Sequence, residues 1–140
     1  MQLSLRIPGH SSALPSALEQ LEEFLLEARV PETVGGEIRL IAEEALANIL
    51  EHARTGGNPP GEVGMLLERI GGELVLEFDD DGPPFDPLRH TAPAPPPTFE
   101  ARLGGGCGLL LLDRLADGMA YSRRGGRNVL RLRKRIARAA

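Results

Sequence analysis

Two Gly-Gly pairs constrain the fold of this chain more than any other feature, because each lies between two segments with the composition of β-strands. The pairs are Gly71-Gly72 and Gly125-Gly126. Glycine is common in two-residue turns because it adopts the positive φ angles that such turns require. The sequence therefore predicts two β-hairpins. Their four strands are expected at residues 62–70, 73–79, 119–123 and 128–136.

The first third of the chain changes from a strand period to a helical period. Residues 2–7 alternate polar and apolar side chains, which is typical of a half-buried strand. A first helix is predicted from Ser11 or Ser12, either of which can cap it, to about Arg29. A second is predicted at about 32–54. Its apolar stripe consists of Val34, Ile38, Ile41, Ala45, Ile49 and Ala53.

A third helix is predicted from Leu109 to about Asp117, which completes the element order βααββαββ. Helices segregated between antiparallel strands indicate an α+β fold. We expect a two-layer α/β sandwich in which one mixed, mostly antiparallel sheet is covered by three helices on one face. The 140 residues are the size of one domain, so residues 1–140 are expected to fold together.

Composition excludes several classes of function. Sixteen Lys and Arg against 20 Asp and Glu give a formal charge of −4, which disfavours direct nucleic-acid binding. No apolar run approaches the ~20 residues that cross a bilayer, and residues 1–10 lack the apolar stretch of a signal peptide. Cys107 is the only cysteine, which excludes an intrachain disulfide and a cysteine-rich metal site. We therefore expect a cytoplasmic protein with protein and small-molecule partners.

The segment LIAEEALANILEHA places Glu44 and Asn48 one helical turn apart on the same side of the second helix. A carboxylate there can activate a hydroxyl, and an amide oxygen can ligate a hard cation. Both residues are predicted at the flank of the apolar stripe, where they border the core. Taken alone, the pair favours a solvated helix edge, and only the two downstream segments described below favour a functional site. His52, one turn further, is expected to have a structural hydrogen bond.

The acidic segment FDDDGPPFDP at 78–87 follows the strand predicted at 73–79. Asp and Gly are also favoured in ordinary turns, but the spaced D-x-D-x-D-G pattern of a calcium loop is absent. Asp80 is the favoured ligand-binding residue, because a carboxylate at a strand end can accept a hydrogen bond from an exocyclic amine. Such a bond distinguishes adenine from guanine. Asp79 and Asp81 would then face solvent.

The glycine cluster GGGCG at 104–108 comes directly before the third predicted helix. It could be a flexible linker, but backbone N–H groups at a helix N-terminus also favour phosphate. No Gly-Lys-Ser/Thr follows, so the cluster is not a P-loop, and the dinucleotide fingerprint is also absent. Cys107 within it is interpreted as a small packing residue.

In this order, the three segments resemble the N, G1 and G2 boxes of the GHKL (Bergerat-fold) ATPases, and within them the anti-sigma factor serine kinases. The resemblance covers about residues 5–135. It implies that Glu44 is the catalytic base, that Asn48 holds Mg²⁺, and that Asp80 binds the adenine amino group of ATP. The nucleotide-contacting residues that it implies are Asn48, Asp80, Gly82, Gly104, Gly105, Gly106, Gly108 and Leu109.

Two positions depart from the family pattern: Pro84 replaces the second G1 glycine, and Arg131 is aligned with the late threonine of the last strand. Residues 86–103 correspond to the lid over ATP. This interval includes TAPAPPPTF, whose composition is also that of a disordered loop. A lid that orders when ATP binds satisfies both interpretations. Arg102, at its end, could then contact a phosphate.

The resemblance implies an ATP-binding, anti-sigma factor-like serine/threonine protein kinase that regulates transcription by partner switching. Its partners would be a sigma factor and an anti-sigma antagonist, and a homodimer is compatible with the family. The alternative is a nucleotide-dependent protein-binding switch without kinase activity. A sensor histidine kinase is disfavoured, because no phosphoacceptor hairpin fits before the first predicted strand.

Overall fold

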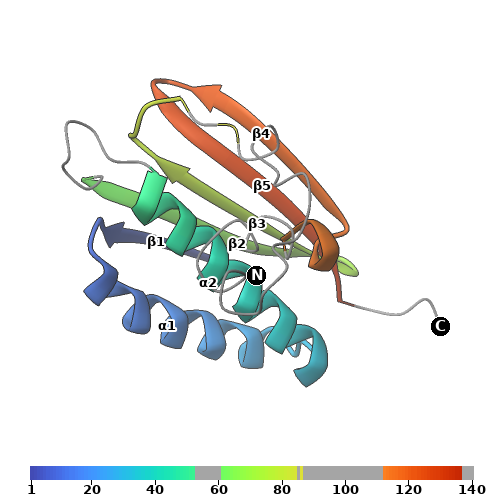
Figure 1. Ribbon diagram of the computed structural model, residues 1–140. Coiled ribbons are helices and arrows are strands. Elements are labelled where there is room, and N and C mark those ends of the chain that lie inside the picture. The colour runs from blue at the N-terminus through green and yellow to red at the C-terminus, as the bar shows by residue number, and fades with distance from the viewer. Residues whose placement is uncertain (53–60, 85, 87–111, 137–140) are drawn as a thin grey trace, which may run out of the picture.

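Five strands and two long helices make up most of the described part of the chain (Figure 1). The computed structural model describes residues 1–52, 61–84, 86 and 112–136. A helical turn at 112–115 precedes the last two strands. The other elements are β1 (Gln2–Pro8), the 3-10 turn η1 (Ser11–Ala13), α1 (Leu14–Glu27), α2 (Glu32–His52), β2 (Glu62–Ile70), β3 (Glu73–Asp80), β4 (Gly118–Arg124) and β5 (Arg127–Arg135).

The strands form one sheet in the order β1-β2-β3-β5-β4, and every neighbouring pair is antiparallel. Both predicted hairpins are confirmed. Gly71 has φ 60°, and Gly125 and Gly126 have φ 57° and 76°. The two hairpins join through β3 and β5, which are distant in sequence. This pairing sets Asp80 opposite Asn128.

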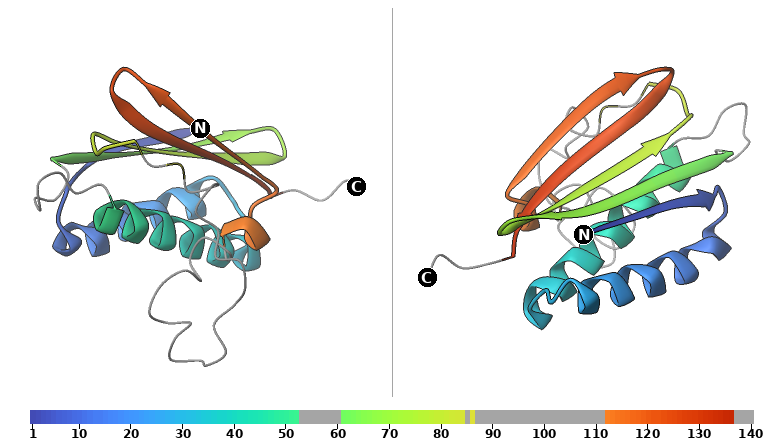
Figure 2. Two further views of the ribbon diagram at one scale, coloured as in Figure 1. Left: turned by 45° about the horizontal axis from the view of Figure 1, so that its top comes forward. Right: turned by 180° about the vertical axis from the view of Figure 1, so that it is seen from behind.

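Helices α1 and α2 cover one face of the sheet, while neither helix covers the opposite face (Figure 2). The two-layer α+β architecture is thus confirmed. Alternation along the strands directs apolar residues toward the helices. Full burial of each large apolar side chain contributes about 1.5–3 kcal/mol to stability. The largest fully buried side chains include Leu21, Ile38, Ile41, Leu46, Met65, Leu67, Leu74, Leu76, Phe78, Leu112 and Leu132.

Helix α1 begins differently from the serine cap predicted from the sequence. Ser11 and Ser12 lie within the 3-10 turn η1, and the residue before that turn is the extended His10. The α-helical N-cap is Ala13, which makes no side-chain cap hydrogen bond. The serine-cap prediction is wrong because a capping side chain needs an extended backbone, and both serines already have a helical one.

Helix α2 confirms its predicted stripe. Ile38, Ile41 and Ala45 are buried, and Val34 and Ile49 pack against the same core. Ala53 lies outside the described residues. The third predicted helix is described only at 112–115, so it ends before Asp117.

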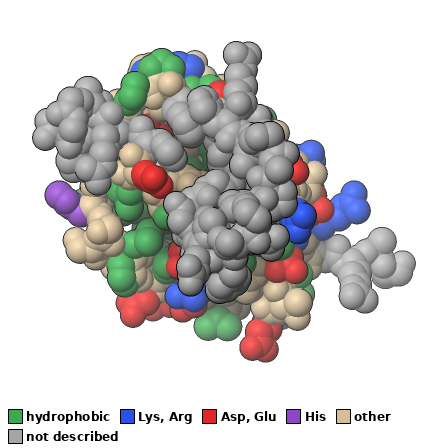
Figure 3. Space-filling model, in the orientation of Figure 1, with side chains coloured by type: hydrophobic (Ala, Val, Ile, Leu, Met, Phe, Trp, Pro, Cys, Tyr) green, Lys and Arg blue, Asp and Glu red, His purple; other side chains and the backbone are tan. Residues whose placement is uncertain are grey.

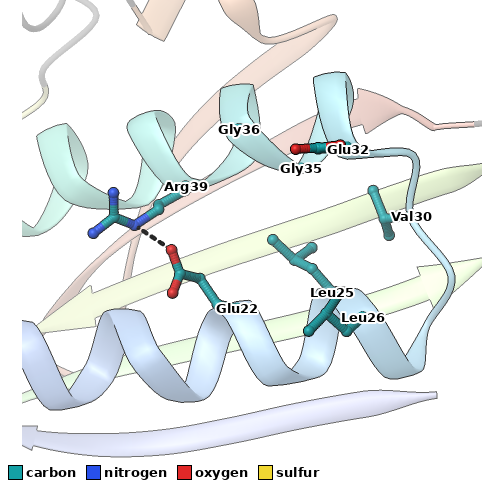
Figure 4. Close-up of a pocket in the computed structure, with 8 residues that line it drawn as sticks. All are labelled: Glu22, Leu25, Leu26, Val30, Glu32, Gly35, Gly36 and Arg39. Atoms are coloured by element: carbon teal, nitrogen blue, oxygen red, sulfur yellow. Dashed lines mark ion pairs between the residues drawn. The ribbon is translucent and has the colours of Figure 1, made fainter.

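A groove lies between the end of α1 and the start of α2 (Figure 4). It has a volume of about 430 Å³. Arg39 Nε lies 2.8 Å from Glu22 Oε1 across it. Acidic and hydrophobic side chains lie side by side on the surface over α1 (Figure 3). The groove borders Gly35 and Gly36, near the opposite end of α2 from Glu44 and Asn48, so it is separate from the predicted nucleotide residues. It is lined by Glu22, Leu25, Leu26, Val30, Glu32, Gly35, Gly36 and Arg39.

Candidate nucleotide site

Asp80 is a buried carboxylate at the last position of β3. It is only 5% exposed, and it faces the helical layer, as do Leu76 and Phe78 earlier in the strand. Its Oδ1 accepts hydrogen bonds from the backbone N–H of Gly82 at 2.9 Å and from Asn128 Nδ2 at 3.0 Å. Both bonds end on Oδ1, and no described residue donates to Oδ2. The second oxygen can therefore accept from a ligand.

Asn128 is the partner that the sequence reasoning missed. It is 6% exposed and lies opposite Asp80 in the β3–β5 ladder. Along β5 it shares a face with the buried Leu130 and Leu132. A polar residue in phase with two core leucines was the signal available in the sequence, because alternate residues of a strand face the same way.

Arg131 lies on the other face of the sheet from Asn128. It is exposed there, and its Nη1 lies 3.3 Å from Glu77 Oε2. The alignment of Arg131 with the family's late threonine stays a prediction. The inward position opposite Asp80 belongs to Asn128, and residues 128 and 131 face opposite ways because they differ by an odd number along a strand.

Glu44 and Asn48 lie on α2 as predicted, and both are partly buried. Asn48 Nδ2 is fully buried and has no hydrogen-bond partner among the described residues. An unsatisfied buried polar atom costs about 1–3 kcal/mol. Amide oxygen and nitrogen exchange places by a simple rotation. The position therefore suits either a phosphate acceptor for the N–H or a cation for the oxygen.

The two halves of the candidate site lie at one end of the molecule. The C-terminal part of α2, which carries Glu44 and Asn48, and the end of β3, which carries Asp80, occupy the same end in Figures 1 and 2. Gly82 is buried just beyond Asp80, and Pro84 is exposed. The remaining predicted residues lie outside the described part of the chain. These are Arg102, Gly104, Gly105, Gly106, Gly108 and Leu109.

The described donor set fits a Mg·nucleotide. Asp80 offers an acceptor for an amine, and Asn48 offers a buried amide without a partner. Among the described residues there is no group of three or more His, Cys, Asp or Glu that could hold a metal. Mg²⁺ bound to a nucleotide does not need one, because it takes one or two protein ligands together with phosphate oxygens and water.

Comparison with known families agrees with this geometry. Residues 7–134 match the histidine kinase-like ATPase domain. The chain therefore belongs to the histidine kinase-like ATPase family, and the resemblance drawn from its three segments is confirmed. No helix in the described part of the chain is long and apolar enough to cross a membrane.

Individual relatives refine the placement within the family. The chain is 30% identical over 129 residues to the serine/threonine-protein kinase BtrW of Bordetella bronchiseptica, with 92% of this chain and 90% of BtrW covered. Its fold is similar to the RsbU and RsbW domains of Rv1364c from Mycobacterium tuberculosis, with a TM-score of 0.70 and 17% identity. That match covers all of this chain and 34% of the other, so the present chain spans about a third of it.

A second structural relative is the SiaB–SiaC complex from Pseudomonas aeruginosa. The TM-score is 0.62 at 18% identity, with 94% of this chain and 88% of the other covered. At such identities the structural matches establish the fold alone. The relative that links the chain to a named activity is therefore BtrW.

Proposed function

We propose that this protein is an ATP-dependent serine/threonine protein kinase. The observation that carries the proposal is Asp80, a buried carboxylate held on one oxygen by neutral donors while its other oxygen receives no hydrogen bond from the described residues. The similarity to a serine/threonine-protein kinase over 92% of the chain supports the same activity.

In the proposed reaction the γ-phosphoryl group of ATP moves to a serine or threonine hydroxyl of a protein substrate, and ADP leaves. Glu44 accepts the proton of the attacking hydroxyl while the hydroxyl oxygen forms the new bond to the γ-phosphorus. Asn48 holds Mg²⁺, which neutralises charge on the phosphates when bound. Asp80 binds the adenine amine, so recognition of the base and chemistry on the phosphate belong to different elements.

The proposed substrate is an anti-sigma antagonist, and a sigma factor is the proposed second partner. Support comes from the resemblance of the three sequence segments to anti-sigma factor serine kinases, together with the 30% identity to the serine/threonine-protein kinase BtrW. Partner switching in the cytoplasm, regulation of transcription and a homodimeric state are part of the same proposal. A native pull-down with and without Mg·ATP recovers these partners if the proposal is right.

Variants of α2 separate kinase activity from a binding switch without chemistry. Glu44→Ala is expected to keep Mg·ATP binding and lose transfer of ³²P from [γ-³²P]ATP to a recovered partner, since a base acts on the nucleophile and not on ground-state affinity. Glu43→Ala, at the neighbouring position, is the matched control and should retain transfer. Wild-type protein that binds Mg·ATP and transfers no label to any recovered partner would leave only the binding switch.

Asn48→Ala tests the assigned metal ligand. It is expected to weaken ATP binding only when Mg²⁺ is present, because the amide acts on the nucleotide through the cation. Titrations of ATP with Mg²⁺ and with EDTA measure the difference. Equal loss of Mg-dependent affinity in Asn48→Ala and Glu44→Ala would show that the roles are not divided as proposed.

A lid at residues 86–103, with Arg102 on a phosphate, remains part of the proposal, as does phosphate binding by residues 104–109. Backbone N–H groups that bind phosphate exchange slowly with solvent. We expect Mg·ATP to slow amide hydrogen exchange most strongly at residues 98–108. Protection spread evenly over the chain would count against a lid.

A further inference from the structure

Asn128 uses the full hydrogen-bonding capacity of its side chain. Nδ2 donates to Asp80 Oδ1 at 3.0 Å and to the backbone oxygen of Pro83 at 2.9 Å. Oδ1 accepts from the Tyr121 hydroxyl at 2.5 Å and from Arg123 Nη1 at 3.1 Å. A primary amide has two N–H donors and two lone pairs on oxygen, so each has a partner.

These partners allow only one orientation of the amide. Tyr121 and Arg123 donate on one side, and the Asp80 carboxylate and the Pro83 carbonyl accept on the other. A rotated amide would set its N–H groups against the donors and its oxygen against the two acceptors. The donor side of Asn128 therefore faces Asp80.

The same network holds the turn that follows Asp80. Arg123 Nη1 also donates to the backbone oxygen of Gly82 at 2.7 Å, while the N–H of Gly82 donates to Asp80 Oδ1. The turn and the carboxylate are thus anchored to β4 and β5 through Asn128. As a result, Asp80 Oδ1 has two donors, whereas Oδ2 has none among the described residues.

We propose that Asn128 is a positioning residue that makes the pocket select a base with an exocyclic amine. By donating to Oδ1, together with the N–H of Gly82, it holds the carboxylate so that Oδ2, which receives no hydrogen bond from the described residues, meets the ligand. The inference rests on the nucleotide binding proposed above and adds a residue that sets base specificity without touching the base.

Replacing the acceptor that faces the ligand at position 80 by a donor tests whether Asn128 fixes the orientation of this side chain. In Asp80→Asn, the donors of Asn128 and Gly82 hold the new amide oxygen at the Oδ1 position, so its NH₂ group faces the ligand. The pocket should then prefer ITP over ATP, because hypoxanthine has a carbonyl where adenine has an amine. A role for Asp80 independent of Asn128 gives no reason for a changed preference.

Exchanging the two residues removes one of the two donors that fix the orientation of the side chain at position 80 and replaces it with an acceptor. In Asp80→Asn combined with Asn128→Asp, the carboxylate introduced at position 128 accepts from the new amide NH₂. The N–H of Gly82 still favours the amide oxygen at the Oδ1 position, so the two preferences compete and the preference for ATP should return in part. This recovery distinguishes positioning from a purely structural contribution, which would make the double variant worse than the single one.

Calorimetric titration of Mg·ATP and Mg·ITP into wild type, both variants and Arg131→Ala tests the proposal. The ratio of ATP to ITP affinity is expected to fall at least about tenfold in Asp80→Asn, on the scale of a hydrogen bond to a charged group, and to rise part of the way back in the double variant. Arg131→Ala, on the exposed face of β5, should keep the wild-type ratio. Thermal unfolding of each variant verifies that it is folded.

If Asp80→Asn does not fold, Asn128→Thr replaces it, because a hydroxyl keeps one donor toward Asp80 but cannot hold Pro83 as well. It should lower ATP affinity about tenfold while the protein stays folded. Two outcomes would overturn the role of Asn128 without affecting the proposed function. They are an equal ratio of ATP to ITP affinity in all folded variants, or an unchanged ATP affinity in Asn128→Thr. Failure of wild type to bind ATP would overturn the proposed function together with the role of Asn128.

Discussion

Asp79 and Asp80 are adjacent in sequence, yet they occupy opposite faces of the sheet and have opposite kinds of partners. Asp79 lies on the open face, where the guanidinium of Arg127 approaches its Oδ1 to 2.7 Å and Arg6 Nη1 approaches to 3.2 Å. Asp80 lies on the helical face, and its hydrogen bonds come from neutral donors. Charge is compensated within the protein at one aspartate and left available for a ligand at the other.

The open face continues this pattern of compensation. Glu77 lies within 3.3 Å of both Arg124 and Arg131, and Glu73 lies 3.5 Å from Arg133. The pKa of Arg6 is raised, first by its hydrogen bond to Glu62 and further by Asp79. Exposed ion pairs each contribute about 0–1 kcal/mol to stability. The charged side chains described on this face are therefore paired with one another and exposed to solvent. The buried carboxylate at the end of β3, in contrast, has an oxygen that can bind a ligand.

The largest expected difference in stability comes from truncating each aspartate. Asp80→Ala leaves the donors of Asn128 and Gly82 without their acceptor, so the free energy of unfolding should fall by about 1–3 kcal/mol. Asp79→Ala removes only partly exposed ion pairs and should cost about 0–1 kcal/mol. Urea denaturation measures both. Equal losses would mean that the two carboxylates are in equivalent environments.

A smaller difference is expected in how the stabilities of the Asp79 and Asp80 variants depend on salt concentration. Raising the ionic strength from 0.1 to 1 M shortens the screening length from about 10 to about 3 Å. The effect of Asp79→Asn on unfolding free energy should therefore shrink at high salt. That of Asp80→Asn should stay nearly constant, because its partners are neutral and buried. Parallel salt dependence of the two variants would contradict this assignment.

The smallest expected effect concerns Gly64, which lies between Arg6 and Asp79 in the sheet. A Cβ there would come within 2.0 Å of Asp79 Oδ2 and 2.3 Å of Arg6 Nη1. The Cγ atom of Asp79 would also lie 2.7 Å away, so the whole carboxylate must rotate aside together with the end of the Arg6 side chain. Gly64→Ala should therefore change stability by less than about 1 kcal/mol and leave ATP affinity unchanged. A tenfold loss of ATP affinity would mean that the open face contributes to the site.

Most of the fold could be predicted from local patterns. The Gly-Gly turns specified both hairpins, and the helical period specified α2 with its core face. The start of α1 could not be predicted, because the choice between a serine cap and a 3-10 turn at Ser11 depends on the surrounding backbone.

The candidate site was only partly predictable for a different reason. Asp80 was identified from its place at the end of a strand, a local property. Asn128 meets it only because β3 pairs with β5 in one register, and pairing between distant strands is not encoded in the residues around either position. The sequence shows alternation along β5 but not which of its residues lies opposite Asp80.

The central claim is that Asp80, and not its neighbour, recognises the nucleotide. Calorimetric titration of Mg·ATP into wild type, Asp80→Asn and Asp79→Asn tests it most directly, since the two variants make the same chemical change one residue apart. We expect Asp80→Asn to lose ATP affinity by about 10- to 100-fold and Asp79→Asn to keep it within about twofold. Unchanged affinity in Asp80→Asn, or equal losses in both variants, would contradict the account.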